Sequence, residues 1–349
     1  MSDSGERMTL QAEVLVVRGD IAESRHRVQA VVVHADGAVR AATDDVARVT
    51  SFRSAAKPFQ LLPFVERGHA DALGVTDREL AIMAASHSGS RMHLDLVRGL
   101  LSRLGLEARH LACGYHDPMD AQSLEDLRLD PSLKSALYNN CSGKHAGMLA
   151  ACVAEGWPVE GYERPEHPLQ RLLLHTVAEC CGVEPATVQL GVDGCSLPVF
   201  GLPLTTMAFG YARFARAIAQ GGDRRETALQ RIGRAMAAHP TVVEGEGRLA
   251  TDLMAATGGR IVAKSGAEGL LLVADPSRQE GVAIKCEDGA MRALGPVSVG
   301  LLEMLEVVTP AESGGLAAHR RTPVTNAAGA VVGHLEARVG ATSGAHVRA

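Results

Sequence analysis

The sequence predicts an α/β fold in which both ends of the chain supply strands to one antiparallel sheet, while the middle is helical. β-Branched runs with turn residues occur near both termini, and apolar residues recur at helical spacing through the middle. No Pro-, Gly- or Ser-rich linker divides the chain. We therefore expect a single domain over residues 10–338, with the sheet from about 10–50 and 258–338, helices over 54–257, and a disordered tail at 339–349.

Composition narrows the classes of function. The chain has 349 residues, of which 46% are hydrophobic and 3% aromatic, and its net charge is -5. Such a charge gives no footprint for nucleic acid or an anionic membrane, so we expect a small-molecule substrate. The start of the chain lacks the order of a signal peptide, and no apolar run reaches membrane-spanning length, which predicts a cytoplasmic protein. The seven scattered cysteines favour reduced thiols or a metal site over disulfides.

The first strands are predicted by β-branched residues. Residues 13–17 and 28–34 form two such runs, and Asp36-Gly37 supplies a hairpin turn before a third strand at 38–42. The chain therefore opens with an antiparallel segment of the sheet.

The middle of the chain reads as a series of helices. Thr76 and Glu79 form a capping box that starts a short helix, and Pro63 is expected to kink or end the apolar helix before it. The further helices predicted by apolar periodicity are 92–104, 145–155, 168–181, 209–219 and 225–238.

The last third changes to strands joined by turns. Residues 260–264, 269–274 and 281–286 read as consecutive strands, which predicts a β-meander. A helix at 297–308 and a final strand at 330–338 complete the expected sheet.

Ser54 and Lys57 form a candidate nucleophile and base. At helical spacing the two side chains lie on one face, where an unprotonated lysine can take the serine's proton. Apolar neighbours favour the neutral amine that such a base requires. The alternative is a helix N-cap followed by a solvated lysine.

Two further clusters strengthen the catalytic interpretation. Ser86-His87-Ser88 follows a helix, and Lys264-Ser265-Gly266 stands at a strand end. The order Ser-x-x-Lys, Ser-x-polar, Lys-Ser/Thr-Gly is typical of penicillin-recognising enzymes and serine β-lactamases. The alternatives are a helix C-cap at Ser86, a loop histidine and an ordinary strand-end lysine.

A separate group of residues suggests a zinc site. Cys141, Lys144 and His145 share one helix start, and Asp193-Gly194-Cys195 supplies a second sulfur and a carboxylate. Two soft sulfurs favour zinc, with a neutral lysine or histidine nitrogen as a further ligand. The alternative is a pair of buried cysteines in unrelated turns.

These segments resemble one known family. The chain is similar to the inducible, thermolabile asparaginase family typified by the rhizobial enzyme, over roughly residues 12–338. The segments that carry the resemblance are Arg53-Ser54-Ala55-Ala56-Lys57-Pro58, Ala85-Ser86-His87-Ser88, Asn140-Cys141-Ser142-Gly143-Lys144-His145, Asp193-Gly194-Cys195-Ser196-Leu197-Pro198 and Ala263-Lys264-x-Gly266-Ala267-Glu268-Gly269. Ser196 and Ser265 depart from the small residues expected there, which touches substrate preference more than the reaction.

The resemblance implies a serine-β-lactamase-like fold and hydrolysis of L-asparagine to L-aspartate and ammonia by a homodimer. It implies two serine–lysine pairs, Ser54 with Lys57 and Ser86 with Lys264. It also implies a zinc site close to Asp193, in which zinc orients the substrate. The implied zinc ligands are Cys141, Lys144 and Cys195, and the residues expected to bind the substrate are Arg53, His87, Asp193 and Gly266.

Two other functions remain open from the sequence. The first is a penicillin-recognising peptidase or esterase that uses the same three clusters. The second is a zinc-stabilised binding protein without catalytic activity. Ammonia release from asparagine distinguishes the asparaginase from both.

Overall fold

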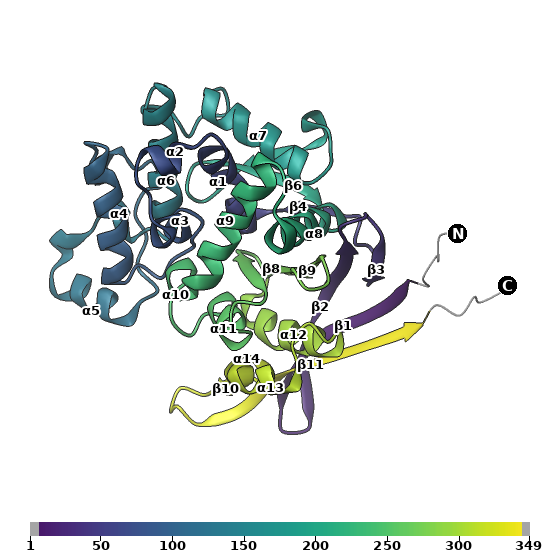
Figure 1. The fold of residues 1–349 in the computed structure, drawn as a ribbon. Helices are drawn as coiled ribbons and strands as arrows, with labels where there is room; N and C mark the ends of the chain where they lie inside the picture. The colour runs from purple at the N-terminus through teal and green to yellow at the C-terminus, as the bar shows by residue number, and fades with distance from the viewer. Residues whose placement is uncertain (1–6, 344–349) are drawn as a thin grey trace, which may run out of the picture. The chain divides into compact units, whose positions relative to one another are not determined.

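The computed structural model describes residues 7–343 and divides into two compact units. The sheet unit takes the chain up to Thr50, Leu202–Ala219 and the chain from Asp252 onward. The helical unit takes Ser51–Gly201 and Gln220–Thr251. Figure 1 shows both, with the chain coloured from its N-terminus to its C-terminus.

The sheet unit is built on an eight-stranded sheet of order β10-β11-β1-β3-β2-β9-β8-β7. N-terminal and C-terminal strands are therefore neighbours, as the purple β1 and the yellow β11 show in Figure 1. The strands are β1 (Met8–Arg18), β2 (Ile21–His34), β3 (Val39–Ala42), β7 (Val262–Gly266), β8 (Leu270–Asp275), β9 (Glu280–Cys286), β10 (Pro323–Thr325) and β11 (Val331–Ser343). The mixed α/β class and the expected β-meander are confirmed.

The strand sequences explain their places in the sheet. Every residue of β8 is buried between β7 and β9, so its Leu-Leu-Leu-Val-Ala run reads as a continuous apolar strand. Strand β11 pairs with β1 from Val17↔His334 to Met8↔Ser343. The prediction of a disordered tail was therefore wrong for residues 339–343, because their backbone continues the ladder although most of their side chains are small. Residues 344–349 of that predicted tail lie outside the described residues.

Five helices accompany the sheet. The helix α12 packs against β1, β9 and β11, and it runs through Pro296 without ending. The helices are α8 (Leu204–Gln220), α11 (Leu249–Ala256), α12 (Met291–Met304), α13 (Pro310–Ser313) and α14 (Ala317–Arg320), with the 3-10 helix η6 (Gly314–Leu316). Only the ends of α8 and α11 belong to the helical unit.

The helical unit holds most of the predicted helices. They are α1 (Lys57–Glu66), α2 (His69–Ala72), α3 (Asp77–Met83), α4 (Arg91–Arg103), α5 (Ala121–Leu129), α6 (Ser142–Glu155), α7 (Pro168–Cys180), α9 (Arg224–Ala238) and α10 (Pro240–Val243). The 3-10 helices are η1 (Arg53–Ala56), η2 (Ala108–His110), η3 (Pro131–Leu133), η4 (Ala136–Tyr138) and η5 (Pro185–Thr187). The small strands β4 (Val49–Ser51), β5 (Gln189–Val192) and β6 (Pro198–Pro203) form a sheet of order β4-β6-β5.

Local sequence signals account for several helix boundaries. The predicted capping box is present, since Thr76 and Glu79 each accept the other's backbone N–H at the start of α3. The helix ends at Met83, and the polar segment that follows leads to Ser86. Pro63 does not end α1, which continues to Glu66. The start of the helix that precedes Ser86 is thus defined by a short sequence motif.

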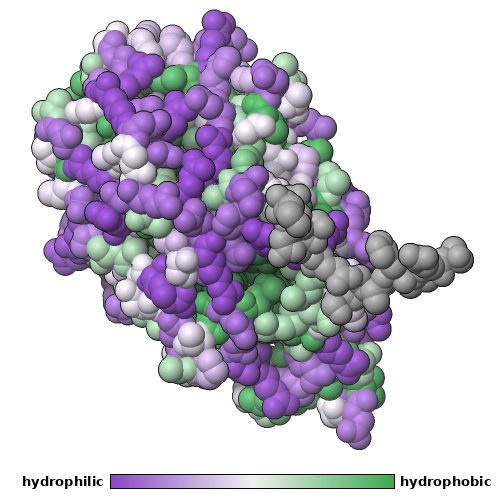
Figure 2. All heavy atoms as spheres, turned by 45° about the vertical axis from the view of Figure 1, so that its right-hand side comes forward, coloured by the Kyte–Doolittle hydropathy of each residue, from purple (hydrophilic) through white to green (hydrophobic). Residues whose placement is uncertain are grey.

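The surface is mixed in character. Figure 2 shows a face on which hydrophilic residues, in purple, are interspersed with smaller groups of hydrophobic residues, in green. Among the large hydrophobic residues of 7–343, Val192 is the most exposed, with 79% of its surface accessible. Within residues 7–343, no helix is long and apolar enough to cross a membrane.

Candidate functional site

The Ser54 segment is a short helical turn that feeds directly into α1. Ser54 lies in η1, and the backbone N–H of Lys57 donates to the Ser54 carbonyl, which holds the two residues on adjacent positions of one turn. Ser54 is half-buried, whereas the Lys57 side chain is fully buried at 0% exposure. Ser54 and a buried lysine side chain therefore start from one helical turn.

The Lys57 amine reaches a second serine. Its Nζ donates to the Ser86 Oγ at 2.7 Å and to the carbonyl of Ala85. The sequence had paired Lys57 with Ser54 and Lys264 with Ser86, but it gave no signal for this contact, which depends on how α1 packs beside the segment after α3. Lys57 is accordingly a candidate base for Ser86 as well as for Ser54.

Several backbone contacts hold the Ser86 segment. The Ser86 N–H donates to the Val243 carbonyl at 2.8 Å, and the carbonyl of Ser88 accepts from both Met119 and Asp120. Gly245 permits the close approach of the chain after α10, because a Cβ there would lie 2.5 Å from the Ser88 Oγ. Ser86 is half-buried on a segment that is fixed from both sides.

Arg53 joins the Ser54 turn to the Asp193 turn. Its φ of 45° lies in the left-handed region, which is strained for a residue with a side chain. Its Nε lies 3.1 Å from the Asp193 Oδ1. Burial alone would raise the pKa of Asp193, but the charges of Lys144 and Arg53 hold it below its ordinary value. The Asp193 carboxylate therefore interacts both with Arg53, the residue before Ser54, and with Lys144.

Cys141, Lys144 and Cys195 meet in one buried cluster, which we call the cysteine–lysine cluster. Lys144 Nζ donates to the Cys195 Sγ at 3.1 Å, and the Cys195 Sγ lies 3.8 Å from the Asp193 Oδ2. Cys141 is the residue before α6, and Gly143 lets that helix approach α3, since a Cβ at Gly143 would lie 2.2 Å from the Ile82 carbonyl oxygen. The spacing along α6 and the turn after β5 thus bring all three predicted ligands together.

The ionisable groups of the cluster shift one another's pKa values. A hydrogen bond from Cys195 holds the pKa of Cys141 well below its ordinary value, with Lys144 adding to the effect against the cost of burial. The same bond, with burial, raises the pKa of Cys195. Burial would lower the pKa of Lys144, but Cys141, Cys195 and Asp193 raise it. The charges of the cluster therefore favour a protonated Lys144 and a more acidic thiol at Cys141 than at Cys195.

The donor chemistry of the cluster fits a soft divalent metal. Two sulfurs and an amine nitrogen are ligands that zinc accepts, provided that Lys144 gives up its proton. Among residues 7–343, no group of three or more His, Cys, Asp or Glu side chains is placed to hold a metal ion. The fit therefore rests on lysine as the third ligand. His145, the alternative nitrogen, faces Tyr162, whose hydroxyl lies 2.6 Å from its Nδ1.

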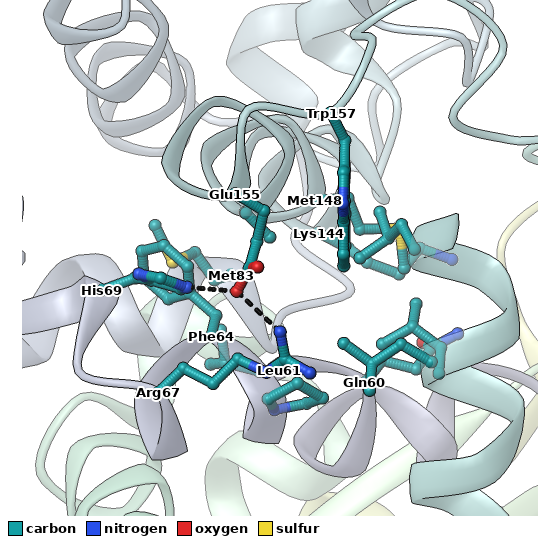
Figure 3. A pocket seen from close by; sticks show the side chains of 16 residues that line it. Gln60, Leu61, Phe64, Arg67, His69, Met83, Lys144, Met148, Glu155 and Trp157 are labelled. Carbon is teal, nitrogen blue, oxygen red and sulfur yellow. Dashed lines mark hydrogen bonds and ion pairs between the residues drawn. The ribbon is translucent and has the colours of Figure 1, made fainter. Parts of the chain in front are cut away.

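An apolar pocket borders Lys144 on another side. Figure 3 shows Lys144, Met83, Met148 and Trp157 around it, with Arg67, His69 and Glu155 at one end. The Glu155 Oε1 lies 2.8 Å from Arg67 and 2.6 Å from His69. These bonds link the chain just after α1 to the end of α6, so the helices that carry Lys57 and Lys144 are braced against each other.

His87 is fully buried, and it does not have the exposed position expected of a substrate ligand. Its Nδ1 accepts from the Gly89 N–H at 3.1 Å, and its Nε2 lies 2.9 Å from the Ser142 Oγ. Ser142 was missed by sequence reasoning, because nothing in its position after Cys141 indicates a partner on another segment.

Lys264 and Gly266 lie in the sheet unit, on β7. Lys264 is fully buried, and its Nζ donates to the carbonyl of Ser265 at 2.9 Å. Gly266 is the last residue of β7 and precedes a tight turn in which Glu268 has a φ of 64°. The Lys-Ser-Gly cluster therefore lies at the end of β7, the last strand in the order of the sheet, and the strand end agrees with the sequence prediction.

Comparison with known proteins gives one extensive match. The family model for L-asparaginase II matches residues 14–337. No curated protein matches the chain. Among solved structures, the chain is similar to Mglu in its native form in 4.3 M NaCl, with 15% identity and a TM-score of 0.35. That alignment covers 79% of this chain, which spans 59% of the length of Mglu.

The family match agrees with the segments in which the resemblance was seen. Residues 14–337 include the Ser54 turn, the Ser86 segment, the cysteine–lysine cluster and the end of β7. Since the match covers far more than half of the sequence, this chain belongs to the L-asparaginase II family.

Proposed function

We propose that the protein hydrolyses L-asparagine to L-aspartate and ammonia through a serine nucleophile and a buried lysine base. Membership of the L-asparaginase II family supports the substrate and the amidohydrolase class. The observation that carries the mechanism is the 2.7 Å hydrogen bond from the Lys57 Nζ to the Ser86 Oγ. Lys57 lies three residues after Ser54 in the sequence. We propose that this one amine serves both hydroxyls during the reaction.

The first half of the reaction transfers the acyl group to serine. The Ser54 Oγ attacks the side-chain amide carbon, and its proton passes to the neutral Lys57 amine. As the carbon–nitrogen bond breaks, Lys57 returns the proton through the Ser86 hydroxyl to the leaving nitrogen, which departs as ammonia. The products of this step are an aspartyl ester on Ser54 and a neutral lysine.

The second half regenerates the enzyme. Water adds to the ester carbon while Lys57 takes its proton, and the same proton returns to the Ser54 oxygen as the ester bond breaks. Lys264 is proposed to assist proton delivery at Ser86, as the second serine–lysine pair implies. Arg53, Asp193 and Gly266 are proposed to bind the substrate.

The cysteine–lysine cluster is proposed to hold zinc through Cys141, Lys144 and Cys195. Bound zinc would supply a positive charge that orients the substrate, because the serines already provide the nucleophile. Within the chain itself, Asp193 and Arg53 connect the cluster to the Ser54 turn. A serine-β-lactamase-like fold, a homodimeric state and a cytoplasmic location are proposed on the same resemblance.

A coupled ammonia assay with L-asparagine tests this function. We expect ammonia release by the wild type, loss of turnover in Ser54→Ala, and no stable acylation by a labelled penicillin. Intact turnover in Ser54→Ala would move the nucleophile to Ser86. Penicillin labelling without ammonia release would identify a penicillin-recognising hydrolase, and neither activity would favour a binding protein.

A further inference from the structure

The hydrogen bonds of His87 fix the position of its ring proton. Its Nδ1 accepts from the backbone N–H of Gly89 at 3.1 Å, so a neutral ring carries its proton on Nε2. The Nε2–H then donates to the Ser142 Oγ at 2.9 Å. The Ser142 hydroxyl in turn donates to the Leu137 carbonyl at 2.9 Å. The donor and the acceptor of each of these three hydrogen bonds are therefore defined.

The surroundings of His87 keep the ring neutral. Burial lowers its pKa well below the ordinary value, and the neighbouring His93 adds to the effect. The two rings stack with centroids 5.0 Å apart and planes 15° apart. With both nitrogens engaged and no exposed surface, His87 is not placed to exchange protons with a substrate.

The bond connects two segments that carry different parts of the candidate site. On one side, the residue before His87 is Ser86, whose hydroxyl accepts from Lys57. On the other side, the residue before Ser142 is Cys141, which belongs to the cysteine–lysine cluster. A shift at either end would move Ser86 relative to the start of α6.

We propose that His87 is a positioning residue whose bond to Ser142 locks the Ser86 hydroxyl in place against the first turn of α6. The catalytic part of this inference rests on the proposed function, since it requires Ser86 to take part in proton transfer. The structural part, that breaking the bond loosens both segments together, does not require it.

Variants at both ends of the bond test the proposal. His87→Gln keeps an N–H donor near the position of Nε2, whereas His87→Asn keeps only an acceptor near the position of Nδ1. Ser142→Ala removes the acceptor from the α6 side. The matched control is Thr176→Val, which removes a buried hydroxyl bond of 2.9 Å to the Leu172 carbonyl on α7.

The expected result is a change in kcat rather than in KM. His87→Asn and Ser142→Ala should each lower kcat by about tenfold to a hundredfold, because a small displacement of a proton-transfer group has effects of that order. His87→Gln should recover most of the loss, and Thr176→Val should retain wild-type turnover. Equal losses in His87→Gln and His87→Asn, or a Ser142→Ala variant with wild-type kcat, would overturn the catalytic part.

Hydrogen exchange measures the coupling without any catalysis. In Ser142→Ala, the amides of residues 86–90 should exchange faster than in the wild type, although the substitution lies on α6. In His87→Asn, the amides of residues 142–146 should respond in the same way. Exchange confined to the substituted segment would overturn the structural part. If the wild type releases no ammonia, the proposed function fails while this measurement still decides the structural part.

Discussion

Lys57 and Lys144 are the same residue type at equivalent places, yet their partners differ. Both lie in the first turn of a helix, and their side chains are 0% and 4% exposed. Lys57 donates to a hydroxyl and a carbonyl, whereas Lys144 donates to a sulfur beside a second thiol and a carboxylate. Two equally buried lysines thus have named partners of different chemistry, and on the proposed function the first is the base and the second a zinc ligand.

The largest effect is expected when the Lys57 amine is removed. Lys57→Met should lower kcat for ammonia release by about a thousandfold, because general-base catalysis contributes about 100-fold to 10,000-fold. Lys144→Met should cost less turnover and lose zinc instead. Thermal melting of both variants controls for folding. A Lys57→Met variant that turns over at the rate of Lys144→Met would erase the distinction between the two lysines.

Removing one sulfur of the cluster tests the metal. Protein purified without added zinc should contain zinc in the wild type, and Cys195→Ala should bind it at least about tenfold more weakly, as loss of groups at a metal site does. Cys152→Ala is the matched control, since Cys152 is a buried cysteine on α6 outside the cluster. Elemental analysis that finds equal zinc in the wild type and Cys195→Ala would reject the site.

Asp193 connects the two regions, and its charge can be removed without changing its shape. Asp193→Asn should raise KM by about tenfold to a hundredfold, since hydrogen bonds to charged groups contribute about 1.5–3 kcal/mol. Arg53 would lose its carboxylate partner at 3.1 Å, and Lys144 would lose one of the charges that raise its pKa. Steady-state kinetics provide the measurement. An unchanged KM would remove Asp193 from substrate binding.

The smallest expected effect is the contribution of His87 to the pH dependence of the free energy of unfolding. The pKa of His87 is lowered well below 6.5 in the folded chain, so below about pH 6.5 the unfolded chain binds more protons. The stability that the neutral ring contributes is complete above that pH and falls as the pH drops toward the folded value. The slope is at most about 1.4 kcal/mol per pH unit. Unfolding of His87→Gln should show a shallower acid dependence than the wild type; an identical slope would contradict this.

Sequence patterns predicted the elements well where the signal is local. The capping box at Thr76 defined the start of α3, and the apolar runs of β7, β8 and β9 defined the meander. The end of β11 was missed because most of residues 339–343 are small, and their strand conformation comes from pairing with β1. Pairing with a strand that is distant in the sequence cannot be predicted from the residues of the segment itself.

The candidate site divides in the same way. Cys141 and Lys144 share one helix turn, so their convergence with Cys195 required only one long-range contact, and it was predicted. The bond between Lys57 and Ser86 depends on the packing of α1 beside the segment after α3, which the four-residue spacing of Ser54 and Lys57 cannot report. The contact of His87 with Ser142 was not predicted for the same reason, since Ser142 lies on another helix.

Trapping the acyl-enzyme tests the central proposal most directly. Acid quenching during turnover of L-asparagine, followed by peptide mass mapping, should find the aspartyl ester on Ser54 in the wild type. The ester should be absent from Ser54→Ala and should not form in Lys57→Met. An ester on Ser86, or one that forms equally well without the Lys57 amine, would contradict the assignment of Ser54 as nucleophile and Lys57 as its base.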